Sequence, residues 1–438
     1  MKKIVFFLQT KKPIGGSQIL FLDLAAYIAQ HYSDYETYYI NYQNDIVEEM
    51  YKDTGIHFLD VEECDYSQFE DATFFIAVNY ALYLSAKIKD LKNATICAYF
   101  YHPHVFSWLQ NQIYYRKQNN LDLLELLSKT DAYCFMDDSN YLPICKLCDL
   151  NFNRYYLPVT VHSKDIQRLE SYDFVKKDTI SFGWLGRLDR DKIYSIINLA
   201  DNLMDIQTDK KIEFHILGDG NSRSFIKIAK YSPKIQFIFT SYMYGSERDK
   251  YMKEHIDIVM AMGISAIDAA VLGIPTIVPI VSPTAFNDDK FVYIYDIQGY
   301  SLGWDPNDLK ELGYKYHRLK DVISDVYDNG KKEEIGKKCA EFTEETFSLK
   351  RGAELLIENV ERTKLTMSEL KKNKTIKSTL RFYGLYKKIR KHRDFPMYHL
   401  FIARLNRIRS QKGLRKISYL FKEAKNTRKY DKAKDELI

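Results

Sequence analysis

The sequence predicts an α/β fold: two successive parallel α/β units followed by a basic helical extension. Short, continuously apolar runs alternate with segments of helical period, which is typical of strands covered by helices on both faces of a parallel sheet. The alternation stops in a polar stretch at residues 162–177 and then restarts. The chain has 438 residues, of which 46% are hydrophobic, so it is long and apolar enough for two such cores.

The first unit is expected to span residues 1–165. Its apolar runs predict strands at residues 4–8, 36–42, 56–61, 74–79, 94–101 and 132–137. A helix is expected at residues 18–30, because apolar side chains recur there on one side. The run at residues 4–8 breaks at Gln9, too soon for an export signal, so we expect a first strand and a cytoplasmic protein.

The second unit is expected to span residues 178–345. The pattern predicts strands at residues 179–186, 212–217, 235–239, 256–262 and 275–281. It predicts helices at residues 192–206, 223–230, 265–272, 311–329 and 331–362. Strands and helices alternate here as in the first unit, so a second parallel sheet is expected.

Candidate ligand-binding loops follow from the sheet type, because open parallel sheets bind ligands at the carboxyl ends of their strands. The first such loop contains Gly15 and Gly16, directly before a helix. Paired glycines let a ligand approach the backbone and expose N–H groups to an anion, although an ordinary tight turn would look the same. The loop lacks the spacing of a dinucleotide-binding fingerprint, so a nicotinamide dehydrogenase gains little support.

The second unit offers a cationic turn and a glycine turn. After the strand that ends at Gly186 come Arg187 and, five residues later, Lys192. An Arg fork and a Lys point charge near a helix start would grip a diphosphate; the alternative is a solvated charged turn. The next strand ends in a flexible turn with Gly218 and Gly220.

A further loop in the second unit begins a short helix. Gly263, Ile264 and Ser265 open it, and their amides would form a second anion site. Asp268 is the one carboxylate on this small, apolar helix. A carboxylate among alanines and leucines is costly unless it forms hydrogen bonds, and a ribose diol is a suitable partner.

Taken in order, these segments resemble the retaining GT-B glycosyltransferases of the family 4 type, over roughly residues 1–362. The resemblance implies two facing Rossmann-like domains, the first on the acceptor side and the second on the side of the nucleotide-sugar donor. It also implies that residues 346–370 form a helix crossing back to the first domain, a job that residues 344–362 could do.

The resemblance also implies roles for single residues. Arg187 and Lys192 would hold the donor diphosphate and stabilise charge on the departing phosphate, while Asp268 would bind the ribose. Gly16 would let the backbone of the first domain approach the donor. A family histidine near the sugar corresponds to His102 or His104; we favour His102, nearer the strand end.

One departure from the family pattern concerns its first acidic residue, which would fall at Met260. A methionine cannot contact a sugar hydroxyl as a carboxylate does. Either this protein handles the donor sugar differently, which we favour because the cationic pair and both glycine turns persist, or it is a non-catalytic member.

No metal or other cofactor is expected. Cationic side chains and helix dipoles can neutralise a leaving diphosphate without a metal. Asp189 and Asp191 have the spacing of a metal-binding DxD motif but belong to the Arg187 turn. Cys145 and Cys148 form a lone CxxC in an apolar run, which favours core residues over a metal or redox site.

Residues 371–438 are expected to be a separate basic amphipathic helical tail. Between Lys371 and Lys434 the chain has 22 Lys and Arg against three acidic residues, whereas the rest is mildly acidic. Basic helices with apolar faces suit an anionic membrane surface, here the inner face of the cell membrane. Contact with a protein ranks second, and nucleic acid is not expected because no reading motif accompanies the charge.

The sequence therefore predicts a glycosyltransferase of polysaccharide biosynthesis. Its partners would be a hexose-type nucleotide-sugar donor and a glycan or lipid-linked acceptor of the membrane or envelope. The alternative is a catalytically inactive GT-B homologue that serves as a binding or scaffolding subunit.

Overall fold

The structure is a computed structural model in which a compact unit, Met1–Ile376, is separate from the segment Lys377–Ile438. It describes residues 1–8, 16–78, 82, 85–102, 117–147, 150–161, 178–240, 243–282, 284–303, 313–374, 376 and 377. The predicted tail thus lies almost wholly outside the described residues.

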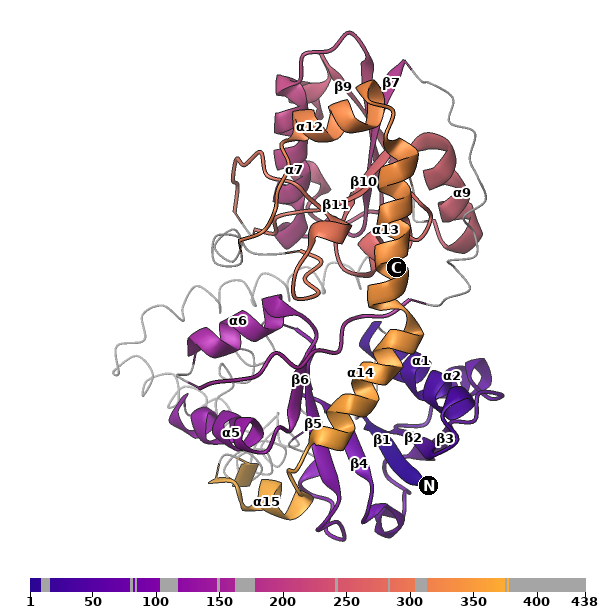
Figure 1. Cartoon of the computed structure of the whole chain (residues 1–438), viewed down its shortest axis with the longest axis vertical. Coiled ribbons are helices and arrows are strands. Elements are labelled where there is room, and N and C mark those ends of the chain that lie inside the picture. The colour runs from indigo at the N-terminus through magenta and orange to yellow at the C-terminus, as the bar shows by residue number, and fades with distance from the viewer. Residues whose placement is uncertain are drawn as a thin grey trace, which may run out of the picture. The chain divides into compact units, whose positions relative to one another are not determined.

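The first domain contains a six-stranded parallel sheet with the order β3-β2-β1-β4-β5-β6 (Figure 1). Its strands are β1 (Lys2–Phe7), β2 (Tyr35–Asn41), β3 (His57–Asp60), β4 (Thr73–Ala77), β5 (Thr95–Phe100) and β6 (Tyr133–Phe135). Its helices are α1 (Gly16–His31), α2 (Asp45–Met50), a 3-10 turn (Tyr66–Phe69), α5 (Lys117–Lys129) and α6 (Asp138–Leu147). All six predicted strands occur; β1, β4 and β5 are buried along most of their length, whereas the edge strand β3 is only partly buried.

The second domain contains another six-stranded sheet, with the order β12-β11-β10-β7-β8-β9. Its strands are β7 (Thr179–Leu185), β8 (Lys211–Leu217), β9 (Ile235–Thr240), β10 (Ile258–Ala261), β11 (Thr276–Val278) and β12 (Val292–Tyr293). Its helices are α7 (Arg190–Asp205), α8 (Ile228–Tyr231), α9 (Gly245–His255), α10 (Ile264–Ala270) and α12 (Leu319–Ile323), with short turns at Arg223–Phe225, Ile294–Asp296 and Ser324–Asp328. The predicted α/β fold with two Rossmann-like domains is confirmed.

Two predicted helices of the second domain are wrong in part. Residues 313–318 of the predicted helix 311–329 are not helical: His317 forms an antiparallel bridge with Phe291, and the helix begins only at Leu319. The short strand β12, which pairs antiparallel with β11, was not predicted. The predicted helix 223–230 is two short turns, because Ile226 leaves the helical region with ψ near 107°.

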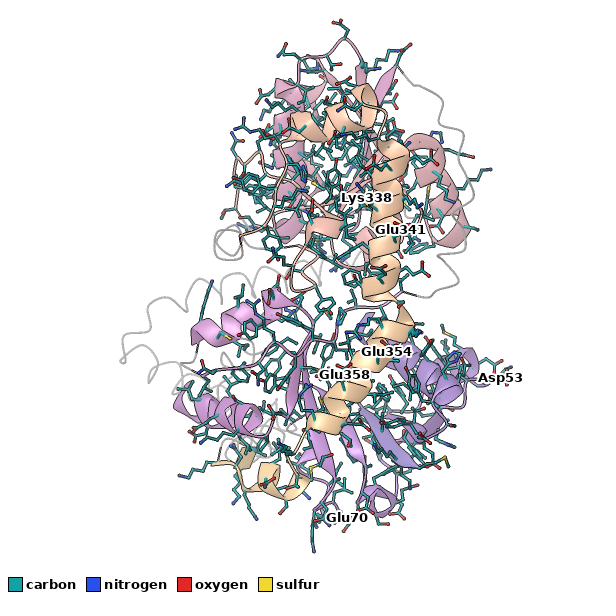
Figure 2. The ribbon with its side chains drawn as sticks, viewed as in Figure 1. Asp53, Glu70, Lys338, Glu341, Glu354 and Glu358 are labelled. Atoms are coloured by element: carbon teal, nitrogen blue, oxygen red, sulfur yellow. The ribbon has the colours of Figure 1, made fainter. Side chains whose placement is uncertain are left out.

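The long predicted helix 331–362 is two helices, α13 (Lys332–Phe347) and α14 (Leu349–Arg362). Ser348 separates them: its backbone is extended, and its hydroxyl accepts a hydrogen bond from the N–H of Arg351, the start of a new helix. The buried face of α13 joins the second core, whereas that of α14 joins the first core. Charged side chains such as Lys338 and Glu358 occupy the other faces (Figure 2).

The last described helix, α15 (Met367–Lys372), lies on the first domain. A capping box between Thr366 and Glu369 starts it, and the Met367 N–H donates to the Ala94 carbonyl at 2.7 Å. The compact unit continues to Ile376, which is fully buried and lies beyond the predicted boundary at residue 371. Within the described ranges, no helix is long and apolar enough to cross a membrane.

Candidate donor-binding edge of the second domain

Three predicted ligand-binding loops meet at one edge of the second sheet. β10, β7 and β8 are adjacent and parallel, and their last residues, Ala261, Leu185 and Leu217, are paired in register. The loops that follow these strands therefore start side by side. Chain order alone does not reveal this adjacency, because β10 begins at Ile258, 73 residues after β7 ends at Leu185.

The two glycine turns pack directly on each other. The Gly186 N–H donates to the Leu217 carbonyl at 3.1 Å, and the Leu188 N–H donates to the Asp219 carbonyl at 3.0 Å. Gly218 has φ +146°, and a Cβ there would lie 2.2 Å from the Gly186 oxygen. A Cβ on Gly220 would lie 2.6 Å from the Leu188 oxygen. Both positions therefore require glycine for the turns to meet.

Arg187 and Lys192 stand at the start of α7. Arg187 leaves 68% of its side chain exposed and pairs with the Asp189 carboxylate at 3.2 Å, while the half-buried Lys192 lies in the first helical turn. Asp189 is the N-cap residue, yet its side chain forms no capping hydrogen bond, because it faces Arg187 instead. The turn thus presents two cations beside a helix N-terminus, an arrangement suited to a diphosphate.

The loop after β10 contains Gly263, Ile264 and Ser265. Gly263 has φ +57°, in the left-handed region that favours glycine, and its N–H donates to the Leu302 carbonyl at 2.9 Å. Ile264 is exposed, and Ser265 is half-buried at the first turn of α10.

Asp268 has a partner that the sequence did not suggest. Its Oδ2 accepts a hydrogen bond from Nη1 of Arg248, on α9, at 2.7 Å. The same guanidinium donates from Nε and Nη2 to Oδ1 of Asp249, at 2.9 and 2.7 Å. Arg248 thus joins two carboxylates, each largely shielded from solvent. The only sign of this partner in the sequence is the mixture of acidic and basic side chains along α9.

Met260, at the position of the missing family acid, belongs to the core. It lies inside β10, beside Trp184 of β7, and is 1% exposed. The methionine packs in the second core and offers no hydrogen-bonding group to the loops.

The first-domain candidates lie at the carboxyl edge of the first sheet. Gly16 is the first residue of α1, and a Cβ on it would meet nothing within 4 Å. Half-buried His102 follows the end of β5. Gly15 and His104 lie outside the described residues.

An acidic pair that the sequence did not single out starts α6. The Asp137 carboxylate caps the helix by accepting hydrogen bonds from the N–H and the side-chain amide of Asn140, at 2.9 and 2.6 Å. Burial raises the pKa of the Asp137 carboxyl to about 7, and the neighbouring Asp138 adds to this rise. Asp138 donates its N–H to the Gly299 carbonyl at 2.8 Å, so this turn contacts the second domain.

Within the described part of the chain, no three His, Cys, Asp or Glu side chains gather as a metal site would require. Cys145 is only half-buried in α6 and is not among the buried core residues, and Cys148 lies outside the described residues, so the interpretation of the CxxC as core residues stays a prediction.

Comparison with known proteins finds likeness in structure rather than in sequence. No protein-family model matches the chain, and no curated protein matches it significantly. A glycosyltransferase from Rickettsia africae ESF-5 is 11% identical, covers 85% of this chain and 99% of its own, and gives a TM-score of 0.51. The N-terminal domain of trehalose-6-phosphate phosphatase from Candida albicans is 12% identical, with 83% and 97% covered and a TM-score of 0.50.

A third solved structure, HepE from Anabaena in complex with UDP and glucose, is 14% identical, with 82% and 100% covered and a TM-score of 0.47. At sequence identities this low, structural similarity establishes the fold alone. The chain has the two-domain GT-B fold, with the candidate donor-binding loops on the edge formed by β10, β7 and β8.

Proposed function

We propose that this protein is a retaining glycosyltransferase that moves a hexose-type sugar from a nucleotide-sugar donor to a membrane- or envelope-linked glycan acceptor. The observation that supports it best is the adjacency of β10, β7 and β8, which brings Arg187, Lys192, two glycine turns and Asp268 to one sheet edge. A site for a nucleoside diphosphate needs cations for the phosphates, glycines that let the backbone come close to them, and a hydrogen-bond acceptor for the ribose hydroxyls, all in one place.

The proposed chemistry follows from these groups. The bond between the anomeric carbon and the diphosphate oxygen breaks, an acceptor oxygen bonds to the same carbon, and the proton of the acceptor hydroxyl passes to the departing diphosphate oxygen. Arg187 and Lys192 neutralise charge on the leaving diphosphate, a role that in other enzymes a metal ion can play. His102, which belongs to the first domain, would lie near the sugar.

The second candidate is a catalytically inactive GT-B homologue that serves as a binding or scaffolding subunit. Met260 favours it, because a buried methionine stands where the resemblance implies a sugar-binding acid. The intact turn with Arg187 and Lys192 favours the enzyme.

Thermal-shift screening against UDP-, GDP-, ADP- and CDP-sugars, with donor turnover measured in parallel, tests both candidates. A donor present at about 100 times its Kd stabilises the fold by about 2.7 kcal/mol. Stabilisation with turnover supports the enzyme, and stabilisation without turnover in the presence of glycan acceptors supports the scaffold. No stabilisation by any nucleotide sugar contradicts both.

We also propose that the basic segment, predicted from residue 371 onward, holds the protein at the inner face of the cell membrane. The segment Lys377–Ile438 has 19 Lys and Arg against five acidic residues. Each basic residue near an anionic surface contributes about 1 kcal/mol of attraction. Contact with a protein partner is the alternative for this segment.

A further inference from the structure

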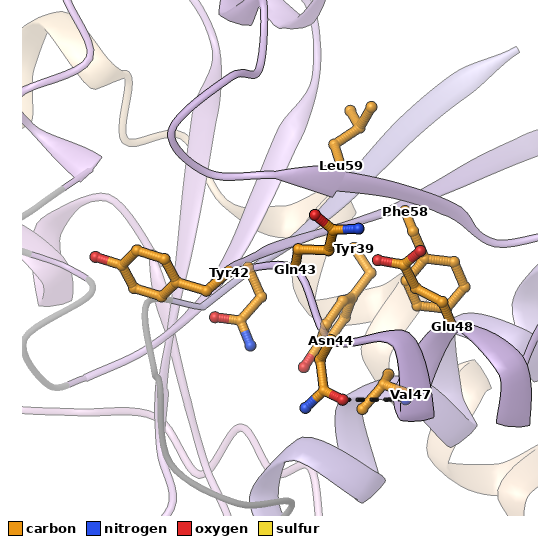
Figure 3. Close-up of a pocket in the computed structure, with 9 residues that line it drawn as sticks. Tyr39, Tyr42, Gln43, Asn44, Val47, Glu48, Phe58 and Leu59 are labelled. Carbon is orange, nitrogen blue, oxygen red and sulfur yellow. Dashed lines mark hydrogen bonds between the residues drawn. The ribbon is translucent and has the colours of Figure 1, made fainter.

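A small polar pocket lies at the carboxyl ends of β2 and β3 in the first domain (Figure 3). Nine described residues line it: Tyr39, Asn41, Tyr42, Gln43, Asn44, Val47, Glu48, Phe58 and Leu59. The pocket is partly open to solvent, and its space of about 10 Å³ can hold one water-sized group. None of the roles discussed above uses these residues.

The floor of this pocket contains an unsatisfied polar group. Tyr39 is 3% exposed, and its hydroxyl has no hydrogen-bond partner. The amides of Gln18 and Asn41 are near enough to lower the pKa of this phenol, which burial nevertheless raises to about 12. A buried hydroxyl left unpaired is costly, so it marks a place where an outside group completes the pairing.

The other lining residues indicate the chemistry of that group. Gln43 and Asn44 offer neutral amides at the rim, and Tyr42 adds a half-buried aromatic ring. Glu48 is the one ionised side chain among the nine lining residues. Amides and aromatic rings suit sugar hydroxyls and sugar faces, whereas a lone carboxylate repels phosphates and acidic sugars.

The place of the pocket in the sheet indicates the size of the ligand. β2 is separated from β5, which leads to His102, by β1 and β4. Three strand spacings amount to roughly 14 Å. A single sugar that reacts near His102 does not reach Tyr39, whereas an oligosaccharide does.

We propose that the pocket is a subsite for a neutral sugar unit of an oligosaccharide acceptor, with one sugar hydroxyl paired to Tyr39. This inference rests on the proposed glycosyltransferase function, which it deepens. Its ligand is the acceptor, so it is tested separately from donor binding.

The test measures binding of fluorescently labelled neutral trisaccharides (maltotriose, cellotriose, mannotriose and chitotriose) to the full-length protein by fluorescence polarisation. We expect at least one to bind with a millimolar or lower Kd, with or without nucleotide. Tyr39→Phe should weaken this binding by about 10-fold, the effect of one lost hydrogen bond, and Gln43→Ala should weaken it less. A trisaccharide ending in glucuronic acid should bind more weakly, because Glu48 repels it.

The matched control is Tyr99→Phe, which removes another buried hydroxyl of the first domain. The Tyr99 hydroxyl donates to the Leu157 carbonyl at 2.9 Å, so its loss should lower the melting temperature and leave trisaccharide binding unchanged. Tyr39→Phe should leave the melting temperature unchanged or raise it.

Three outcomes would overturn the inference: no binding of any neutral trisaccharide at millimolar concentration, equal weakening by both Phe variants, or a lower melting temperature of Tyr39→Phe with binding intact. The last would mean that the hydroxyl is bonded within the protein. Trisaccharide binding by a protein that binds no nucleotide sugar would instead contradict the proposed function and leave the subsite standing.

Discussion

Arg248 and Asp268 form an ion pair between two helices that follow successive strands, with Nη1 of the arginine 2.7 Å from Oδ2 of the carboxylate. Each side chain is 20% exposed, so the pair is partly shielded from water. The arginine is also held by Asp249, at 2.7 Å. The carboxylate proposed to bind ribose is thereby fixed in direction by a residue on the preceding helix.

Arg248→Ala should therefore weaken nucleotide binding as well as stability. It leaves Asp249 and Asp268 without their shared cation, a loss on the order of 1–3 kcal/mol for a partly buried pair. Calorimetric titration with the best nucleotide from the donor screen, together with urea unfolding, measures both effects. Arg351→Ala is the control, because its pair with Glu354 is more exposed and should contribute under about 1 kcal/mol.

Asp268→Asn separates a ribose ligand from a structural helix residue. The amide keeps the size of the side chain but loses a charged acceptor, so nucleoside binding should weaken by several-fold. Comparison of a nucleoside diphosphate with the corresponding 2′,3′-dideoxy form shows whether the ribose diol is the group concerned. Normal nucleotide binding with a lower melting temperature would identify Asp268 as structural.

Arg187→Ala and Lys192→Ala should each cut the affinity for a nucleoside diphosphate by about 10- to 150-fold, the equivalent of about 1.5–3 kcal/mol for one charge-assisted contact. Both positions are at least partly exposed, so the fold should keep its melting temperature. Affinity for the matching nucleoside, which has no phosphate, should hardly change. Unchanged diphosphate affinity in both variants contradicts the assignment of this turn.

Truncation tests the basic segment. Removal of residues 377–438 should leave folding and donor binding intact, because the compact unit ends at Ile376. Removal from residue 371 should lower the melting temperature, because it deletes buried Ile376 and the Lys371 ammonium that donates to the Leu91 carbonyl.

Vesicle sedimentation compares the full chain with the shorter protein that ends at Ile376. The full chain should bind anionic vesicles, and this binding should fade with added salt as the charges are screened. Equal binding to anionic and neutral vesicles, or none, would favour the protein-contact alternative.

The buried carboxyl of Asp137 predicts a pH dependence of stability. Its pKa of about 7 in the folded protein exceeds the ordinary value of about 3.9, so the folded state keeps a proton that the unfolded chain releases. The contribution of this group is therefore complete below about pH 4 and is lost as pH rises to about 7, by up to about 4 kcal/mol.

Urea unfolding of the wild type and Asp137→Asn between about pH 5 and pH 8 checks this contribution. The amide can still accept from the Asn140 N–H, so the difference in unfolding free energy should change with pH up to about 7 and then level off. Asp325→Asn is the control: hydrogen bonding to Lys331 lowers the pKa of Asp325, so its contribution is lost only below about pH 4 and the difference from the wild type should stay constant over this range. A difference that does not vary with pH contradicts the raised pKa of Asp137.

The sequence by itself determined every strand except the short β12, and the order of the others along the chain. A buried central strand such as β1 is recognised from its own residues, because burial on both faces leaves a continuous apolar run in the sequence. The glycines of the turns after β7 and β8 were also found, since glycine before a helix is a local signal. Helix ends were less certain: Ser348 ends α13 and starts α14 in an unbroken helical pattern.

Tertiary structure decided which of these segments meet. The order β10-β7-β8 places loops side by side that are far apart in the chain, and only the packed turns explain why Gly218 and Gly220 must lack a Cβ. The pair of Arg248 and Asp268 joins residues on two helices, and the Tyr39 hydroxyl lacks a protein partner only because of the neighbours that folding places around it. Hydrogen bonding and burial depend on neighbours brought together by folding, which a linear pattern does not contain.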